Sequence, residues 1–368
     1  MPNNKYLTIQ EACELLRVSR PTFNKIRKQR RLREFVFGKR RRFLREDIVS
    51  IGEPTPVTRL APDKRLDLTV FRPETPAALI SAPDTFDLRR IRQFDPHGVL
   101  TLFCAAVDHA ERGHEVRFEL EDDFICNHLR ALGFFQELEK KCGDRIVWDK
   151  SRLRTDYTDF KYPIPLTNIR LQKEEAPIVS RLIGLLRAQG FSEGIGGYIG
   201  WIFGELVDNA TTHLVHSGEL SVPSDCYLLA QRFKFATGDS ECIIIGVADV
   251  GPGIHATLKR NQKYSTLSDG RAFLTAFKPN VSSWADEYGR GKGLTDILTI
   301  AMGNKSVLRA ESGENVWSAD FRDGAHQLRS DGHLPKGTRF SLVLIDHEFE
   351  IKSNADAEKQ INELLAKQ

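Results

Sequence analysis

The first hydrophobic pattern along the chain has helical spacing. Ala12, Leu15 and Leu16 recur three or four positions apart after Thr8, and Glu11 follows Thr8 by three residues. A hydroxyl and a carboxylate at that spacing form a capping box, in which each side chain bonds the other residue's backbone N–H. The pattern therefore predicts a short helix that begins near Thr8 and buries the three apolar side chains.

A second helix and a strand pair follow directly. Ser19 can cap a helix over residues 20–29, with Pro21 in its first turn. Residues 35–44 then alternate apolar and basic side chains around Gly38, which predicts a hairpin with a basic tip. Two short helices joined by a tight turn, with a polar and basic second helix, are typical of a helix-turn-helix.

The next block alternates strand and helix patterns. Residues 51–64 contain three prolines and are predicted to be a linker. Within residues 65–150 we expect strands at 67–71 and 115–120 and a helix over 99–112. This alternation predicts an α/β domain.

The last block also alternates helices and strands, with glycine clusters between them. An apolar strand over 242–248 ends at an aspartate, and a glycine-rich loop precedes a helix that runs to about Met302. The tail carries Ile361, Leu364 and Leu365 at helical spacing, so a C-terminal helix packed on the body is expected.

The charge distribution and the cysteine spacing limit the classes of function that the chain can have. Residues 1–50 hold 14 Lys and Arg against 5 Asp and Glu, whereas the rest of the chain has a net charge of −6. This asymmetry favours a polyanionic partner for the basic part. No apolar run is long enough to span a membrane, and the N-terminus lacks the apolar core of a signal peptide, so a cytoplasmic protein without a membrane partner is expected. The cysteines form no Cys-x-x-Cys pair, which argues against a zinc or disulfide framework.

The N-terminal pattern resembles the small winged-helix domains of phage excisionases and MerR-type regulators, from Leu7-Thr8-Ile9-Gln10-Glu11-Ala12 to Arg45-Glu46-Asp47-Ile48. The resemblance implies binding to duplex DNA, with basic groups along phosphates. The residues expected on DNA are Arg20, Thr22, Asn24, Lys25, Arg27, Lys28, Lys39, Arg40, Arg41 and Arg42.

The middle block resembles STAS domains through the helix after Asp95 and a Leu-Gly-Phe-Phe corner at 132–135. STAS anti-sigma antagonists carry a phosphorylatable serine after the aspartate, but here Pro96 and His97 follow it. Proline cannot accept phosphate, so a scaffold or a contact for a protein partner is expected. His97 could accept phosphate or be an ordinary histidine on a surface loop, and the sequence favours the surface loop.

Four motifs in the last block suit a nucleotide site: Glu205 to His213 in a helix, Asp249 to Ile254 after a strand, the glycine loop at 289–294, and Gly337-Thr338. The carboxylate of Asp249 could accept the exocyclic amine of adenine, and the Thr338 hydroxyl could support that carboxylate directly or through water. Glu205 and Asn209 lie four apart and so share one helix face. An asparagine oxygen can complete the coordination of Mg²⁺, and a carboxylate can polarise an attacking water. The glycine loop before the Met302 helix offers free N–H groups to phosphates.

These motifs together resemble the N-box, the two glycine boxes and the late Gly-Thr of the GHKL ATPases, which include gyrase, the MutL proteins, histidine kinases and anti-sigma serine kinases. The resemblance implies an α/β sandwich with helices on one face of a mixed sheet, ATP and Mg²⁺ as cofactors, Glu205 as the catalytic residue and residues 255–288 as a mobile lid. Asn209 is the expected Mg²⁺ ligand, and the nucleotide-binding residues are Asn209, His213, Asp249, Gly251, Gly253, Gly289, Gly291, Lys292, Gly293 and Thr338.

The expected fold class is thus α/β and multidomain. It comprises a winged helix at 1–50, a linker at 51–64, a STAS-like domain at 65–150, a GHKL domain at 165–346 and a tail at 347–368. An ATP-gated DNA-binding regulator with ATPase activity is favoured, and a homodimer fits that role. A serine or histidine protein kinase of the partner-switching type and a non-hydrolysing ATP sensor stay open.

Overall fold

A computed structural model describes most of the chain in two compact units, Met1–Lys64 and Arg65–Gln368. The described residues are 6–16, 19–29, 34–37, 40–44, 66–70, 80–82, 84–120, 123–150, 164–169, 175–188, 190–212, 225–234, 241–283, 293–332, 334–345 and 349–367.

The smaller unit contains the predicted helix pair and hairpin. Its elements are β1 (Tyr6–Thr8), α1 (Ile9–Leu16), α2 (Arg20–Gln29), β2 (Glu34–Phe37) and β3 (Arg40–Leu44). The strands form an antiparallel sheet in the order β1-β3-β2. The predicted capping box is confirmed, because Glu11 Oε2 accepts from the Thr8 N–H at 2.7 Å and Thr8 Oγ1 accepts from the Glu11 N–H at 3.3 Å.

A small apolar core holds this unit together. Leu7, Ala12, Phe23 and Phe43 are buried, and the Phe23 and Phe43 rings meet edge to face with their centroids 5.2 Å apart. The prediction for Leu15 is wrong, because its side chain is 44% exposed. The apolar face of such a short helix is narrow, and Ala12 alone among its described central positions points fully inward.

The larger unit is built on a seven-stranded sheet. Its strands are β10 (Ile164–Ile169), β11 (Cys226–Lys234), β12 (Glu241–Asp249), β13 (Val307–Ser312), β14 (Asn315–Asp320), β15 (Ala325–Ser330) and β16 (Thr338–Leu344), in the spatial order β10-β11-β12-β16-β13-β14-β15. Every described pairing is antiparallel, so the expectation of a mixed sheet is wrong for these pairs. Direct hairpins join several of the neighbours, and a hairpin makes its strands antiparallel.

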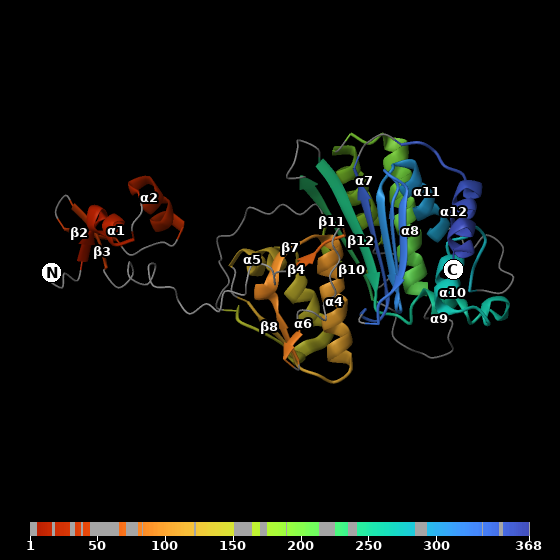
Figure 1. Cartoon of the computed structure of the whole chain (residues 1–368), viewed down its shortest axis with the longest axis horizontal. Helices are drawn as coiled ribbons and strands as arrows, with labels where there is room; N and C mark the ends of the chain where they lie inside the picture. The colour runs from red at the N-terminus through yellow and green to blue at the C-terminus, as the bar shows by residue number, and fades with distance from the viewer. Residues whose placement is uncertain are drawn as a thin grey trace. The chain divides into compact units, whose positions relative to one another are not determined.

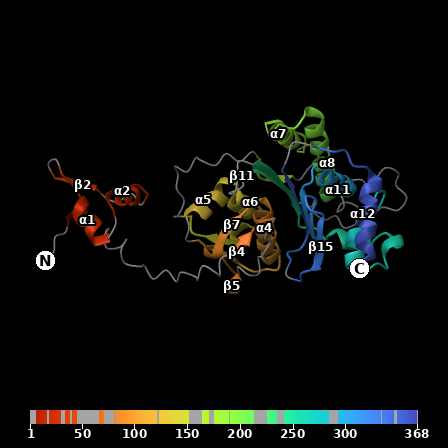
Figure 2. The same cartoon turned by 45° about the horizontal axis from the view of Figure 1, so that its top comes forward.

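Helices cover both faces of this sheet (Figures 1 and 2). One face packs against α7 (Glu175–Ala188), α8 (Glu193–Thr212), α11 (Gly293–Gly303) and α12 (Asn354–Ala366). The other face packs against α4 (Pro96–Glu111). The expectation of helices on one face is therefore wrong, and the reason is that the middle part of the chain buries apolar surface against the second face.

The middle part contributes its own strands and helices. The two-stranded sheet pairs β4 (Leu66–Leu68) with β7 (Ile91–Phe94), and the four-stranded sheet orders β5 (Ile80–Ala82), β6 (Thr85–Asp87), β8 (Val116–Glu119) and β9 (Ile146–Trp148). Helices α5 (Asp123–Ala131) and α6 (Phe134–Cys142) meet at Gly133, and the 3-10 turns η3 (Leu88–Arg90) and η4 (Gly143–Arg145) complete the fold. Its core is continuous with Tyr227, Leu229 and Ala248 of the large sheet.

The segment expected to be a mobile lid is folded over most of its length. It contains α9 (Ile254–Leu258), η8 (Gln262–Tyr264) and α10 (Asp269–Thr275). Leu258, Tyr264, Ala272 and Ala276 form a separate small core within it. These apolar contacts make the segment a short helical subdomain rather than an irregular loop, and residues 284–288 lie outside the described part.

The predicted C-terminal helix is present as α12. Ser353 and Asp356 cap it reciprocally, and Ala357, Ile361 and Leu364 face the core. Leu365 is only partly buried, although it packs against the same core. None of the helices in the described ranges has the length and apolar character needed to cross a bilayer. All six cysteines are free thiols in this structure, and four of them are buried.

Candidate functional site

A polar cluster forms where β12 and β16 end side by side. Asp249 is the last residue of β12 and pairs with Thr338, the first residue of β16. Its Oδ1 accepts the Gly251 N–H at 2.8 Å. Asp249 and Thr338 are therefore direct neighbours on paired strands, although they lie far apart in the sequence.

The backbone around Asp249 is held by close contacts. Gly337 has φ +100°, and a Cβ there would lie 1.9 Å from the Asp249 carbonyl oxygen. Only glycine allows this approach and this backbone conformation. Ser312 Oγ accepts the Ile254 N–H at 2.7 Å and lies 3.4 Å from the Thr338 hydroxyl. The turn after β12 is thus tied to the end of β13.

Strand alternation shows which face this cluster lies on. Ile243, Ile245 and Val247 of β12 belong to the core beneath α8 and α11, and Asp249 continues the same alternation. Phe340 and Leu342 place Thr338 on that face in the same way. The polar cluster therefore lies at the edge of the face that the helical layer covers.

Burial changes the electrostatics of Asp249. Loss of hydration raises the pKa of its carboxyl group, while hydrogen bonds from Gly251 and Thr338 pull the pKa back. The net shift is upward, so ionised Asp249 is held at a cost in folding free energy. A donor group of a ligand that bonds the free side of this carboxylate offsets that cost.

The other predicted nucleotide residues fall on two helices and an adjacent loop. Glu205 and Asn209 lie in α8, which contacts α11 and strands β11 and β12. Gly293 is the first residue of α11, where the first backbone N–H groups of a helix have no intrahelical acceptor. The predicted residues His213, Gly289, Gly291 and Lys292 lie outside the described ranges. The side chains of Glu205 and Asn209 lie outside them as well.

The opposite face of the sheet carries a buried ionic network that the sequence did not reveal. Glu311 accepts from Arg309 Nε and Arg339 Nε at 2.8 Å each. His97 of α4 completes the group, with its Nε2 3.1 Å from Arg309 Nε and its Nδ1 3.1 Å from Ser341 Oγ. The expectation of a surface loop for His97 is wrong, because the residue is 3% exposed in the first turn of α4.

Opposite charges control the ionisation of Glu311. Burial by itself raises the pKa of this carboxyl group, but His97, Arg309 and Arg339 together hold its pKa well below the usual range. Arg339 follows Thr338 directly, so the network begins one residue from the polar cluster on the other face. The residues of this network are His97, Arg309, Glu311 and Arg339. Because they lie far apart in the sequence, no local sequence motif indicates the network.

The residues predicted to contact DNA occupy α2 and β3. Arg20 is exposed, and Asn24 and Arg27 are partly exposed along α2. The side chains of Thr22, Lys25, Lys28 and Arg40 to Arg42 lie outside the described part, as does Lys39 entirely. The backbone still corrects one expectation, since Arg40, Arg41 and Arg42 form part of the central strand β3 instead of a hairpin tip.

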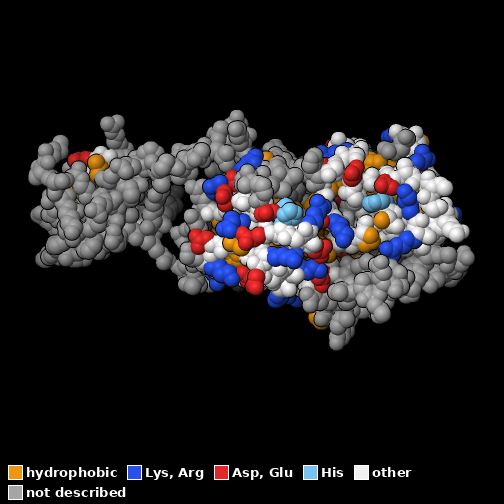
Figure 3. Space-filling view, turned by 90° about the horizontal axis from the view of Figure 1, so that it is seen from below, with side chains coloured by type: hydrophobic (Ala, Val, Ile, Leu, Met, Phe, Trp, Pro, Cys, Tyr) orange, Lys and Arg blue, Asp and Glu red, His pale blue; other side chains and the backbone are white. Residues whose placement is uncertain are grey.

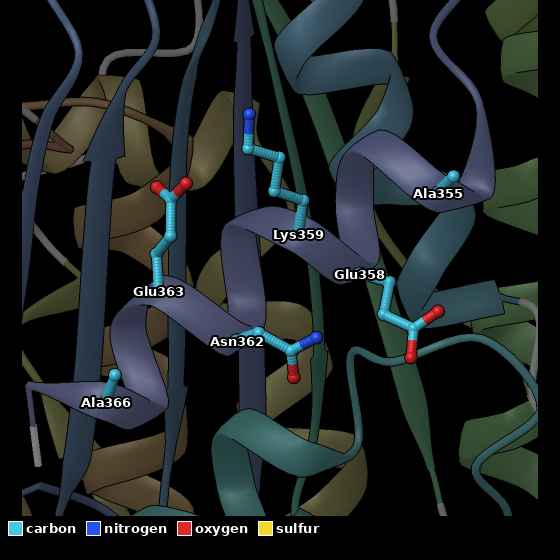
Figure 4. Close-up of a pocket in the computed structure, with 6 residues that line it drawn as sticks. All are labelled: Ala355, Glu358, Lys359, Asn362, Glu363 and Ala366. Atoms are coloured by element: carbon cyan, nitrogen blue, oxygen red, sulfur yellow. The ribbon is translucent and has the colours of Figure 1, made fainter.

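Another feature of the described surface lies along the C-terminal helix. A shallow depression follows the outer side of α12, where Figure 4 shows Lys359 and Glu363 directed to one side and Glu358 and Asn362 to the other. These are exposed side chains without a buried polar group among them. On the face of the larger unit in Figure 3, basic and acidic side chains are interspersed, so no single sign dominates there.

Comparison with known families assigns the N-terminal part. A family model described as a helix-turn-helix domain matches residues 6–50. The chain therefore combines a helix-turn-helix domain, a type of module that binds DNA, with a larger mixed α/β unit. A comparison with curated proteins returned no match.

Proposed function

We propose that this chain is a DNA-binding regulator whose larger unit binds ATP and Mg²⁺ in the manner of the GHKL ATPases. The observation that carries the proposal is the cluster of Asp249, Thr338 and Gly251 at the end of β12. A partly buried carboxylate braced on one side by protein donors can accept the exocyclic amine of adenine on the other. The helix-turn-helix match supports the DNA-binding half.

The order of elements supports the same assignment. The chain passes first through α8, which contains Glu205 and Asn209, and then through β12, which ends at Asp249. The helical segment over 254–283, the start of α11 and β16 with Thr338 follow in that order. Asn209 would hold a Mg²⁺ ion, which would supply positive charge to the phosphates, and the Glu205 carboxylate would orient and deprotonate the attacking water. The start of α11, near the glycine loop, suits phosphate oxygens.

The segment over 254–283 is the candidate lid. Its own small core lets it move as a unit, while the Ile254–Ser312 hydrogen bond ties one end of it to the sheet. Nucleotide contacts with this segment would couple ATP occupancy to the surface it presents to a partner or to a second copy of the chain. The STAS-like middle part is then the proposed contact for a protein partner.

Glu205→Ala separates hydrolysis from binding. We expect the variant to bind ATP with Mg²⁺ at close to the wild-type affinity, because the nucleobase site is intact. We expect hydrolysis to fall by about 100-fold or more, since a positioned general base contributes that much. Calorimetric titration and phosphate release measure the two quantities, and Glu193→Ala, an exposed change at the start of the same helix, is the control. Unchanged turnover in Glu205→Ala would remove Glu205 from the mechanism.

A protein kinase is the alternative that the same pocket allows. The buried position of His97 speaks against this histidine as an internal phosphoacceptor, so the acceptor would be a second protein. Transfer of labelled γ-phosphate to a co-purified protein, with no release of free phosphate, would redirect the assignment from ATPase to kinase.

A further inference from the structure

Two histidines and an aspartate converge at the far end of α4. Asp84 lies in the turn between β5 and β6, His109 in the last turns of α4, and His114 in the turn before β8. Asp84 Oδ1 is 2.9 Å from His109 Nε2 and 3.0 Å from His114 Nδ1. The three potential ligand atoms lie within 4.8 Å of one another.

We propose that Asp84, His109 and His114 form a binding site for a divalent transition-metal ion of the Zn²⁺ class. Two imidazole nitrogens and one carboxylate oxygen are a donor set that such ions favour, and the single negative charge offsets part of the ion's charge. Ligand atoms each about 2.1 Å from one tetrahedral ion lie about 3.4 Å apart. The two oxygen–nitrogen distances, 2.9 and 3.0 Å, are slightly shorter, so the ligand atoms need to move apart by only about 0.5 Å to admit the ion.

The surrounding structure fixes two of the three ligands. Asp84 has φ +70°, and its carbonyl oxygen accepts the Arg117 N–H at 2.7 Å, so the turn is anchored to β8. The His109 ring meets Phe86 edge to face with a centroid distance of 5.9 Å. His114 is about half exposed, and its ring lies 4.5 Å from that of His109 at an angle of 23°. Binding therefore requires His114 to tilt, which its exposed position allows.

The ion would tie the β5–β6 turn to the C-terminal end of α4. Water can complete its coordination on the exposed side, next to His114. This site lies on the middle part of the chain and shares no residue with the proposed nucleotide site, so its test is independent of ATP binding.

The test is titration of the full chain with Zn²⁺, and with Co²⁺ as a spectroscopic probe of the ligand set. We expect one equivalent bound, with Asp84→Asn and His114→Gln each weakening affinity by more than about tenfold. Asparagine tolerates positive φ, and His114 is on the surface, so both variants should fold. Circular dichroism checks that they do.

The matched control is His326→Gln, which replaces a partly buried histidine of β15 that lies outside the cluster. Binding that Asp84→Asn and His114→Gln leave unchanged, or that His326→Gln weakens as much as they do, would overturn the proposal. The absence of stoichiometric binding by the wild-type chain would overturn it as well.

Discussion

At the scale of single residues, Asp249 and Glu311 of the larger unit hold their carboxylates under opposite conditions. Asp249 is partly buried and accepts the Gly251 N–H, and loss of hydration leaves its pKa raised. Glu311 contacts two arginines, and its pKa lies well below the ordinary range. The first arrangement leaves a carboxylate ready for a ligand, and the second satisfies its carboxylate within the protein.

Asp249→Asn tests the ligand role of this carboxylate. Asparagine keeps an oxygen for the Gly251 N–H but presents an amide donor where adenine offers a donor, so ATP affinity should fall more than about tenfold. Calorimetric titration of the variant with ATP and Mg²⁺ measures the loss. Asp320→Asn, a change of a partly buried carboxylate on β14, is the control and should leave affinity unchanged.

Although Asp249→Asn should lower ATP affinity, it should not lower the stability of the folded protein. Because burial raises the folded-state pKa of Asp249, the ionised form opposes folding, and this cost is fully present above the raised pKa. It disappears as pH falls to the ordinary value of 3.8. At neutral pH Asp249→Asn should therefore melt at or above the wild-type temperature, and this difference should shrink on acidification. A large loss of stability would show that Asp249 is a structural residue.

At the scale of elements, α4 is fastened to the large sheet through both apolar and ionic contacts. Gly246 of β12 permits the approach, because a Cβ there would lie 2.5 Å from Leu100 of α4. The group of His97, Arg309, Glu311 and Arg339 then fixes the helix over β13 and β16. A substitution that shifts α4 would therefore also shift β16, the strand that begins at Thr338.

Glu311→Gln should be strongly destabilising. It leaves Arg309 and Arg339 buried without their counter-charge, and breaking a buried ion pair in this way costs about 3–5 kcal/mol. Denaturant unfolding of the larger unit measures the effect. Asp320→Asn, which removes the half-exposed pair with Arg322, should cost less than about 1 kcal/mol. Equal effects of the two changes would mean that the network is not what holds α4 to the sheet.

For the helix-turn-helix, Arg20→Ala should weaken DNA binding. Arg20 is exposed at the start of α2, so a phosphate contact there would release a counterion. Its loss should reduce the slope of log affinity against log salt by about 0.9. Gln10→Ala, exposed on α1, is the control and should leave the slope unchanged. Binding that is insensitive to salt in the wild-type chain would contradict electrostatic recognition.

Local patterns predicted the elements well because their causes are local. The Thr8–Glu11 capping box and helix α2 at residues 20–29 could both be inferred from the sequence. What could not be inferred depends on distant partners. The burial of His97 follows from Ser341 and Arg309, more than 200 positions away, and the Asp84–His109–His114 cluster follows from how α4 meets the β5–β6 turn.

At the scale of the whole molecule, the two compact units carry separable chemistry. Residues 6–50 match a helix-turn-helix domain, and the larger unit holds the proposed nucleotide site. An ATP-gated regulator requires that occupancy of one unit changes the behaviour of the other. That coupling is the central claim of the proposed function.

The most direct test is the rate of ATP hydrolysis by the intact chain with Mg²⁺, measured with and without duplex DNA. The account predicts turnover that changes with DNA, a response that Arg20→Ala weakens, and loss of turnover in Glu205→Ala. Turnover that is identical with and without DNA, under salt conditions where DNA is bound, would contradict the coupling of the two units.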